Sequence, residues 1–276
     1  MTKYRKLQAR ILTAIVGCPV IVAAVYFGDV PFLTMIMLLA ILCLNEFLPL
    51  LRGNNKEAHR FDILVYVASL VLILSAHSGE APWIWDALWV KITIATGILY
   101  FLWELFSEKV YFKEHHIMDS LRSIFYIGFF FPFFVLIRGL PEHGLGYTIF
   151  LTFAIWVNDS FAYFIGLTLG RHKLNPKISP KKSLEGAWGG FLATLIYAYF
   201  IGPYVGFSSQ QALFVGAVLS LLAQGGDLLE SLYKRTANTK DASTVLPGHG
   251  GFLDRMDSFI LTGPVYYFLL IHYFIK

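Results

Sequence analysis

A polar stripe near the C-terminal end of the chain carries the residue types best suited to chemistry. Asp227, Glu230, Ser231 and Lys234 follow one another at spacings of three, one and three residues inside an apolar segment. On an α-helix these spacings place all four side chains on one face. Because buried carboxylates are costly unless they have a partner or a ligand, we expect this face to line a water-filled cavity. The alternative is that Asp227 pairs with a buried cation.

A second acidic group follows the stripe. Asp254 and Asp257 lie three residues apart at the start of the last apolar segment, so we expect them to share a helical face. Magnesium binds one or two carboxylates and keeps its other coordination sites for water and phosphate oxygens. We therefore predict that Asp227 and Asp254 hold Mg²⁺. Glu230 and Asp257 are expected to orient these ligands or to hold a second metal ion.

Basic residues and glycines surround the acidic residues in a way that suits a polyphosphate. The basic residues are Lys234, Arg235, Lys240 and Arg255. Gly250 and Gly251 allow backbone amides to approach an anion. His249 and Asp241 complete the predicted catalytic group, although a turn histidine with no catalytic role is an alternative for His249. The sequence contains no P-loop and no H-E-x-x-H motif, so nucleotide binding here requires another kind of site.

The basic loop at residues 171–185 contains five Lys and Arg residues. Five cations alone would suit a topological anchor. An anchor does not explain the polar groups that accompany them, which include Asp159 in the preceding apolar segment. We therefore predict a functional role for this loop beyond that of an anchor. The predicted substrate-binding residues are Asp159, Lys181, Lys182, Ser183, Ser231, Gly250 and Gly251.

The elements that position these groups are apolar helices. Of the 276 residues, 57% are hydrophobic and 14% are charged, whereas soluble domains carry about 25% charged residues. The apolar residues occur in blocks close to the roughly 20 residues that a helix needs to cross a bilayer. We predict an all-α polytopic membrane protein with nine spans. The predicted spans are residues 11–28, 31–51, 62–77, 87–107, 121–138, 147–170, 186–203, 211–232 and 257–275.

The distribution of basic residues predicts the orientation of these spans. With the N-terminus in the cytoplasm and the C-terminus outside, 19 of the 22 Lys and Arg residues fall in cytoplasmic loops. This is the pattern of the positive-inside rule. Both long polar segments then face the cytoplasm, so we expect the active site there, in a membrane such as the bacterial inner membrane.

The whole chain, residues 1–276, is predicted to be a single membrane domain. Residues 1–145 would form variable N-terminal helices, and residues 146–276 would form the catalytic helices and loops. Glu46 and Glu104 lie near the cytoplasmic ends of N-terminal spans. We expect each of them to reach the interface or to pair with a loop cation, as long polar side chains near helix ends do.

The segment at residues 231–257 resembles the phosphatidate cytidylyltransferases, also called CDP-diacylglycerol synthases. It reads S-L-Y-K-R-T-A-N-T-K-D-A-S-T-V-L-P-G-H-G-G-F-L-D-R-M-D and matches every fixed position of the family pattern. Tyr233 is a departure, because the pattern has an aliphatic residue or Phe there. Residues 158–166 and 178–183 also look like family segments, with Asn158 where Ser is more usual. The resemblance covers residues 150–275 well and the first 140 residues only in hydrophobic character.

This resemblance implies that CTP reacts with phosphatidic acid to give CDP-diacylglycerol and pyrophosphate, with Mg²⁺ held at Asp227 and Asp254. CTP and phosphatidic acid are the expected partners, nucleic acid is not, and a homodimer is left open. One alternative is a CTP-dependent enzyme that acts on another lipid phosphate or on a prenol. The other is an ion-coupled transporter that uses Asp159, Asp227 and Glu230 as a relay. The lack of inverted repeats argues against a transporter.

Overall fold

The computed structural model describes residues 17–52, 62–77, 88–110, 116–239, 242–243, 245 and 250–274, and every structural statement below concerns these residues. Nearly all of them are helical. In the N-terminal half the helices are Gly17–Phe27, α2 (Asp29–Arg52), α3 (Asp62–His77), α5 (Leu88–Ser107), α6 (His116–Ser123) and α7 (Pro132–Arg138). In the C-terminal half they are α8 (Gly144–Thr168), α9 (Leu184–Ile201), α10 (Ser209–Thr236), α11 (Leu253–Ile260) and α12 (Thr262–Leu269). Short 3₁₀ and π-helical segments occupy Ile124–Phe129, Gly202–Val205 and Leu270–Phe274.

Six of the described helical segments are long and apolar enough to cross a membrane. They are Asp29–Arg52, Val90–Ser107, Ile117–Arg138, Gly144–Thr168, Leu184–Val205 and Ser209–Thr236. Their outer faces expose large apolar side chains, such as Phe164 on α8, and Trp188 and Phe200 on α9. Exposed apolar surface of this kind fits lipid contact. The predicted polytopic membrane protein is therefore confirmed in its class.

The last predicted span, residues 257–275, differs from the structure. The described part of this region consists of α11, α12 and the π-helical segment Leu270–Phe274 instead of one continuous helix. Pro264 has no backbone N–H, so it cannot donate to the carbonyl of Ile260 four residues earlier. The helix α11 ends at Ile260. The break places Asp254 and Asp257 on a short helix of their own.

The basic loop at residues 171–185 is not the irregular connection that an all-α fold predicts. It contains an antiparallel hairpin of β1 (Lys173–Asn175) and β2 (Ser179–Ser183). The Asn175 side-chain oxygen accepts hydrogen bonds from the amides of Lys177 and Ile178, each at 3.1 Å. Asparagine commonly stabilises turns in this way. The hairpin therefore forms because of its turn, although the sequence of this charged segment has only a weak strand pattern.

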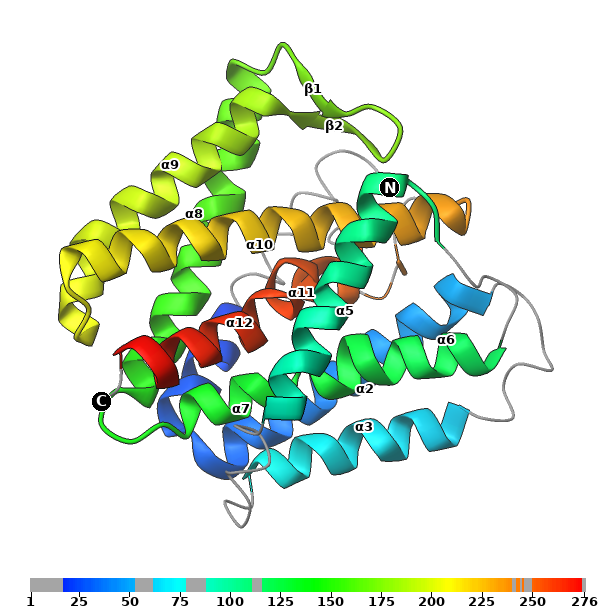
Figure 1. Cartoon of the computed structure of the whole chain (residues 1–276), viewed down its shortest axis with the longest axis horizontal. Coiled ribbons are helices and arrows are strands. Elements are labelled where there is room, and N and C mark those ends of the chain that lie inside the picture. Colours follow the sequence, from blue (N-terminus) through cyan, green and yellow to red (C-terminus); the bar gives the residue numbers. More distant parts are fainter. Residues whose placement is uncertain are drawn as a thin grey trace.

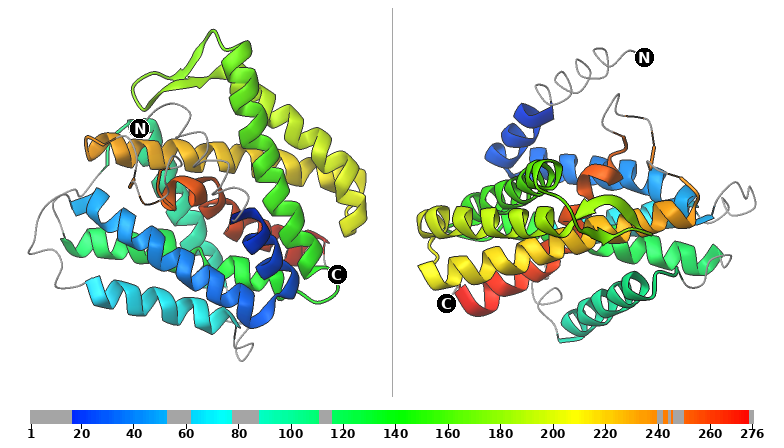
Figure 2. Two further views of the ribbon diagram at one scale, coloured as in Figure 1. Left: turned by 180° about the vertical axis from the view of Figure 1, so that it is seen from behind. Right: turned by 90° about the horizontal axis from the view of Figure 1, so that it is seen from above.

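The long helix α10 connects the two parts of the molecule. Figure 1 shows α10 crossing the middle, with α9 and the hairpin on one side, α2, α3, α6 and α7 on the other, and α8 crossing α10. It contacts α8, α9, α11 and α5, while α2 contacts α11 from the N-terminal half (Figure 2). The helices α8 and α9 approach closely at Gly190, where a Cβ atom would lie only 3.0 Å from that of Ala162. Small residues allow such backbone approach between membrane helices.

Candidate active site

Three carboxylates gather where α10 packs against α11. One oxygen each of Asp227, Glu230 and Asp257 lies within 4.8 Å of the others. We call these three residues the acidic cluster. The helices meet closely because Gly226 has no side chain, and a Cβ atom there would overlap the backbone carbonyl oxygen of Asp257. The backbone of α11 is thereby pressed against the turn of α10 that carries Asp227.

The acidic cluster has the character of a divalent-cation site. Glu230 is fully buried, Asp257 is buried and Asp227 is half-buried. Within the described part of the chain, the Glu230 oxygens have an ion pair with Lys234 but no further hydrogen-bond donor. Like charges held this close repel each other unless a cation or a proton neutralises them. Carboxylate oxygens are ligands that Mg²⁺ accepts, so the donor set fits this ion.

Lys234 joins the two helices beside the acidic cluster. Its Nζ pairs with Glu230 on α10 and lies 2.5 Å from Oδ1 of Asp254 on α11. The other Asp254 oxygen accepts from the amides of Gly251 at 2.7 Å and Ala242 at 3.3 Å. Burial alone raises the pKa of Asp254, but the hydrogen bond and charge of Lys234 outweigh it and lower that pKa below its ordinary value. Asp254 is therefore ionised at neutral pH.

The hairpin contributes a second ammonium group to the site. Nζ of Lys182 lies 2.6 Å from Oδ2 of Asp227. The hairpin is also tied to α10 by Arg235, whose Nε donates to the carbonyl of Ile178 at 3.1 Å. Asp159 on α8 lies within electrostatic reach of Asp227, Asp257 and Lys182. The structure thus brings together the predicted groups on α8, the hairpin, α10 and α11.

The balance of charge in this assembly is negative. The acidic cluster and Asp254 supply four carboxylates, and three of them, those of Asp227, Glu230 and Asp254, pair with the ammonium groups of Lys182 and Lys234. With all six groups ionised, two negative charges remain, and Asp159 on α8 adds to this excess when it is ionised. A buried excess of this size is unfavourable in the absence of a ligand. The site is therefore built to receive positive charge.

The remaining predicted residues are placed as follows. Ser183 is buried and caps α9 by accepting from the amide of Gly186 at 3.1 Å. Gly250 has a positive φ of 85° and lies against Asp254, where a side chain would collide. The Gly251 amide already donates to Asp254. Lys181 and Arg255 are exposed, and Ser231 is buried. Lys240, Asp241 and His249 lie outside the described residues.

Two carboxylates of the N-terminal half reach this region, and the sequence analysis assigned neither to it. Glu46 on α2 accepts hydrogen bonds from the first backbone amides of α11 and from Ser243. Glu104 on α5 accepts from Tyr233, at 2.8 Å, and from Arg122, at 3.0 Å. Glu104 thus pairs with a cation, as expected, but this cation, Arg122, lies on helix α6 and not in a loop. Glu46 binds backbone amides and a hydroxyl instead.

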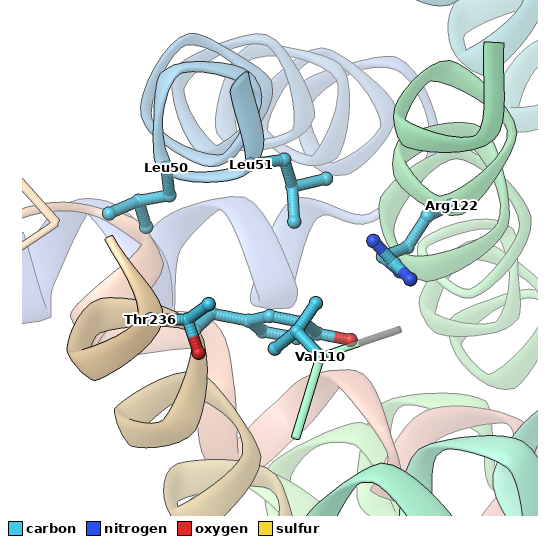
Figure 3. A pocket seen from close by; sticks show the side chains of 6 residues that line it. Leu50, Leu51, Val110, Arg122 and Thr236 are labelled. Atoms are coloured by element: carbon cyan, nitrogen blue, oxygen red, sulfur yellow. The ribbon is translucent and has the colours of Figure 1, made fainter. Parts of the chain in front are cut away.

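A small hollow lies beside the last turns of α10 and is separate from the acidic cluster. Figure 3 shows it between the end of α2, the arginine of α6 and the last turns of α10. It is lined by Leu50, Leu51, Val110, Arg122, Tyr233 and Thr236. None of the three clustered carboxylates borders it, so the hollow is not the candidate catalytic site.

Comparison with known proteins extends the resemblance over almost the whole chain. The model of the cytidylyltransferase family matches residues 8–274. A phosphatidate cytidylyltransferase of Bacillus subtilis is 34% identical over 274 residues, which cover 96% of this chain and 97% of the relative. The phosphatidate cytidylyltransferase of Staphylococcus aureus (strain COL) is 32% identical, covering 96% of this chain and 99% of the relative. The match includes the N-terminal half, and this chain belongs to the cytidylyltransferase family.

Proposed function

We propose that this protein transfers the cytidylyl group of CTP to phosphatidic acid and so forms CDP-diacylglycerol and pyrophosphate. The names of its relatives and the match along the whole chain support this reaction. The structural observation that carries the proposal is the acidic cluster, whose three carboxylates lie within 4.8 Å of one another and outnumber the two ammonium groups that pair with the cluster. A site of this kind suits a reaction in which a divalent cation and polyphosphate meet beside the bilayer.

The reaction needs no covalent enzyme intermediate. An oxygen of the phosphatidic acid phosphate attacks the α-phosphorus of CTP, and a new P–O bond forms there. The bond from the α-phosphorus to the oxygen that bridges to the β-phosphorus breaks, and pyrophosphate leaves with that electron pair. Enzymes of phosphoryl and nucleotidyl transfer act mainly by positioning and by neutralising charge. No serine or cysteine nucleophile is therefore required.

We assign the acidic cluster as the holder of Mg²⁺, which supplies charge neutralisation at the phosphates when bound. Its buried carboxylates and the Glu230 oxygens, which lack a further donor, support this assignment. Asp227 belongs to the predicted metal pair as well. Asp254 was the other predicted ligand, and its contacts with Lys234 and Gly251 favour a role in holding the Lys234 ammonium in place. Substituting each carboxylate in turn distinguishes the acidic cluster from the predicted pair of Asp227 and Asp254 as the Mg²⁺ ligands.

The basic groups of the site would bind the phosphates. Lys182 and Lys234 each bridge two elements and contact the carboxylates, so they would supply positive charge to the phosphates of a bound nucleotide. We place the lipid phosphate on the side of Asp159, Lys181 and Lys182, at the hairpin. The other residues that we assign to substrate binding or catalysis are Arg235, Arg255, Ser183, Ser231, Lys240, Asp241, His249, Gly250 and Gly251.

We further propose that the active site faces the cytoplasm of a bacterial cell, with nine spans, an inner N-terminus and an outer C-terminus. The 19 basic residues in the predicted cytoplasmic loops and the bacterial sources of the relatives support this orientation. Sequence analysis leaves a homodimer open, and cross-linking in native membranes would detect it.

The test is transfer of label from α-³²P-CTP into chloroform-soluble product by purified protein in detergent. We expect product only when phosphatidic acid and Mg²⁺ are both present, and none with the β,γ-label. A prenol or an ether-lipid phosphate as the preferred acceptor would overturn the assignment of substrate. Absence of transfer to any lipid acceptor by protein that binds CTP would overturn the reaction itself.

A further inference from the structure

We propose that Glu46, in the N-terminal half, positions the first turn of α11 and thereby sets the orientation of Asp254 and Asp257. Glu46 does not touch the acidic cluster, so its role is that of a positioning residue. The inference rests on the proposed function, because it assigns the aspartates of α11 to the reaction. It gives the N-terminal helices a part in the active site beyond membrane anchoring.

The contacts of Glu46 converge on the segment that leads into α11. Its Oε1 accepts from the Ser243 hydroxyl at 2.6 Å and from the Phe252 amide at 3.0 Å. Its Oε2 accepts from the Leu253 amide at 2.7 Å. The side chain is 5% exposed. Both carboxylate oxygens are therefore used by a segment about 200 residues away in the sequence.

These hydrogen bonds supply what α11 lacks. The first amides of any α-helix have no partner within the helix and need an acceptor from elsewhere. In most helices a polar residue at the N-cap provides it, but Phe252 holds that position in α11 and has no polar side chain. Glu46 provides the acceptor from another helix. Its negative charge also lies at the positive end of the helix dipole.

The close packing of Gly251 against Glu46 restricts the position of the backbone at the start of α11. A Cβ atom on Gly251 would overlap the Glu46 carboxylate, so glycine at this position allows the close approach. The Gly251 amide donates to Asp254, and the next two amides, of Phe252 and Leu253, donate to Glu46. Three consecutive amides are thus held by two carboxylates.

The consequence for the site follows from the geometry of a short helix. Asp254 lies in the first turn of α11 and contacts Lys234, while Asp257 lies one turn later in the acidic cluster. A shift of the first turn moves both carboxylates relative to α10. Misplacement of catalytic groups by about 1 Å can cost on the order of 100-fold in rate. We therefore expect the contacts of Glu46 to affect turnover and Mg²⁺ affinity together.

The experiment compares wild-type protein with Glu46→Gln and with the control Asn45→Ala, all as full chains in detergent. Glutamine keeps the shape and one acceptor oxygen, but its NH₂ group faces the Leu253 amide. Asn45 is the exposed neighbour of Glu46 on α2 and bonds to Tyr66 instead. The measurements are hydrogen exchange of residues 250–258 without substrate, kcat, and the Mg²⁺ concentration that gives half-maximal rate.

For Glu46→Gln we expect exchange of the Phe252 and Leu253 amides to be about tenfold faster, because hydrogen bonds to a charged acceptor are stronger than those to a neutral one. We also expect a kcat about tenfold lower and a half-saturating Mg²⁺ concentration several-fold higher, with an unchanged KM for phosphatidic acid. Asn45→Ala should match wild type in all of these. Unchanged exchange, or faster exchange with unchanged kcat and Mg²⁺ dependence, would overturn the proposal.

A second variant keeps the test open if Glu46→Gln does not fold. Ser243→Ala removes one of the three donors and leaves both backbone amides bonded, so we expect changes in the same direction of about two- to threefold. No change in exchange or Mg²⁺ dependence in this variant would then contradict the role of Glu46. The exchange measurement does not depend on turnover. If the wild-type protein fails to transfer cytidylyl groups, the proposed function is overturned, but the exchange rates still show whether Glu46 caps α11.

Discussion

Two buried groups of charges lie along the C-terminal part of α10, and they differ in how their carboxylates are satisfied. On one side Glu104 accepts hydrogen bonds from Tyr100 at 2.6 Å, Arg122 at 3.0 Å and Tyr233 at 2.8 Å. On the other side Glu230 has the ammonium of Lys234 and two neighbouring carboxylates. Both glutamates are fully buried.

The difference distinguishes charged groups that stabilise the fold from charged groups that are suited to bind a ligand. The arginine group, which consists of Arg122 with Glu104, Asp119, Tyr100 and Tyr233, ties α5 and α6 to α10 with donors from the protein itself. The acidic cluster holds three carboxylates within 4.8 Å of one another, and its donors are the ammonium groups of Lys182 and Lys234 and the Ser258 amide, so negative charge is left in excess. We therefore expect substitutions in the first group to lower stability and substitutions in the second to lower activity.

The largest expected effect is on turnover in Asp227→Asn. Loss of one predicted Mg²⁺ ligand should lower kcat by about 1,000-fold, in the range for groups that stabilise charge in a transition state. The thermal midpoint without Mg²⁺ should stay the same or rise, because one of several repelling charges is removed. Steady-state assays and thermal unfolding of the same preparation check both parts. Turnover above one tenth of wild type would contradict the assignment of Asp227.

Next in size is the effect of Arg122→Met on stability. Removing one partner from a buried ion pair leaves an uncompensated charge and costs about 3–5 kcal/mol. The free energy of unfolding in mixed micelles should fall by about this amount, while kcat per folded molecule stays within about threefold of wild type. Lys109→Met, a substitution of an exposed cation near the same end of α5, is the matched control. A kcat loss without a loss of stability would place Arg122 in the active site instead.

The smallest expected effect is that of Tyr233→Phe. The hydroxyl of Tyr233 donates to Glu104, and loss of one such hydrogen bond costs about 1–2 kcal/mol. Activity should not change, because Phe is a residue that the family pattern has at this position. Thermal unfolding and the labelled-CTP assay measure the two quantities side by side. A tenfold fall in kcat would show that the hydroxyl acts in the site and not only in the arginine group.

Local helix geometry explains which parts of the site were predictable from sequence. The stripe of Asp227, Glu230 and Lys234 lies on one continuous helix, as its spacing predicted. The three-residue spacing of Asp254 and Asp257 correctly placed both on one helix. It contained no information on where α10 lies, however, so the contact of Asp254 with Lys234, and the place of Asp257 instead of Asp254 in the acidic cluster, could not be foreseen.

Long-range contacts and weak local patterns account for the rest. Glu46 is 206 residues from Phe252, and only its cost as a carboxylate at membrane depth marked it in the sequence. The hairpin strands, of three and five residues, are charged and lack an alternating apolar pattern. The break between α11 and α12 followed from Pro264, a signal that the continuous apolar run of the last predicted span concealed.

The most direct test of the central claim is the effect of Mg²⁺ on thermal unfolding in wild type, Arg122→Met and Asp257→Asn. A ligand at about 100 times its Kd stabilises the state that binds it by about 2.7 kcal/mol. We predict that saturating Mg²⁺ raises the midpoint of wild type and of Arg122→Met by the same amount, with little rise for Asp257→Asn. An equal rise in all three proteins would contradict the assignment of the acidic cluster as the cation site.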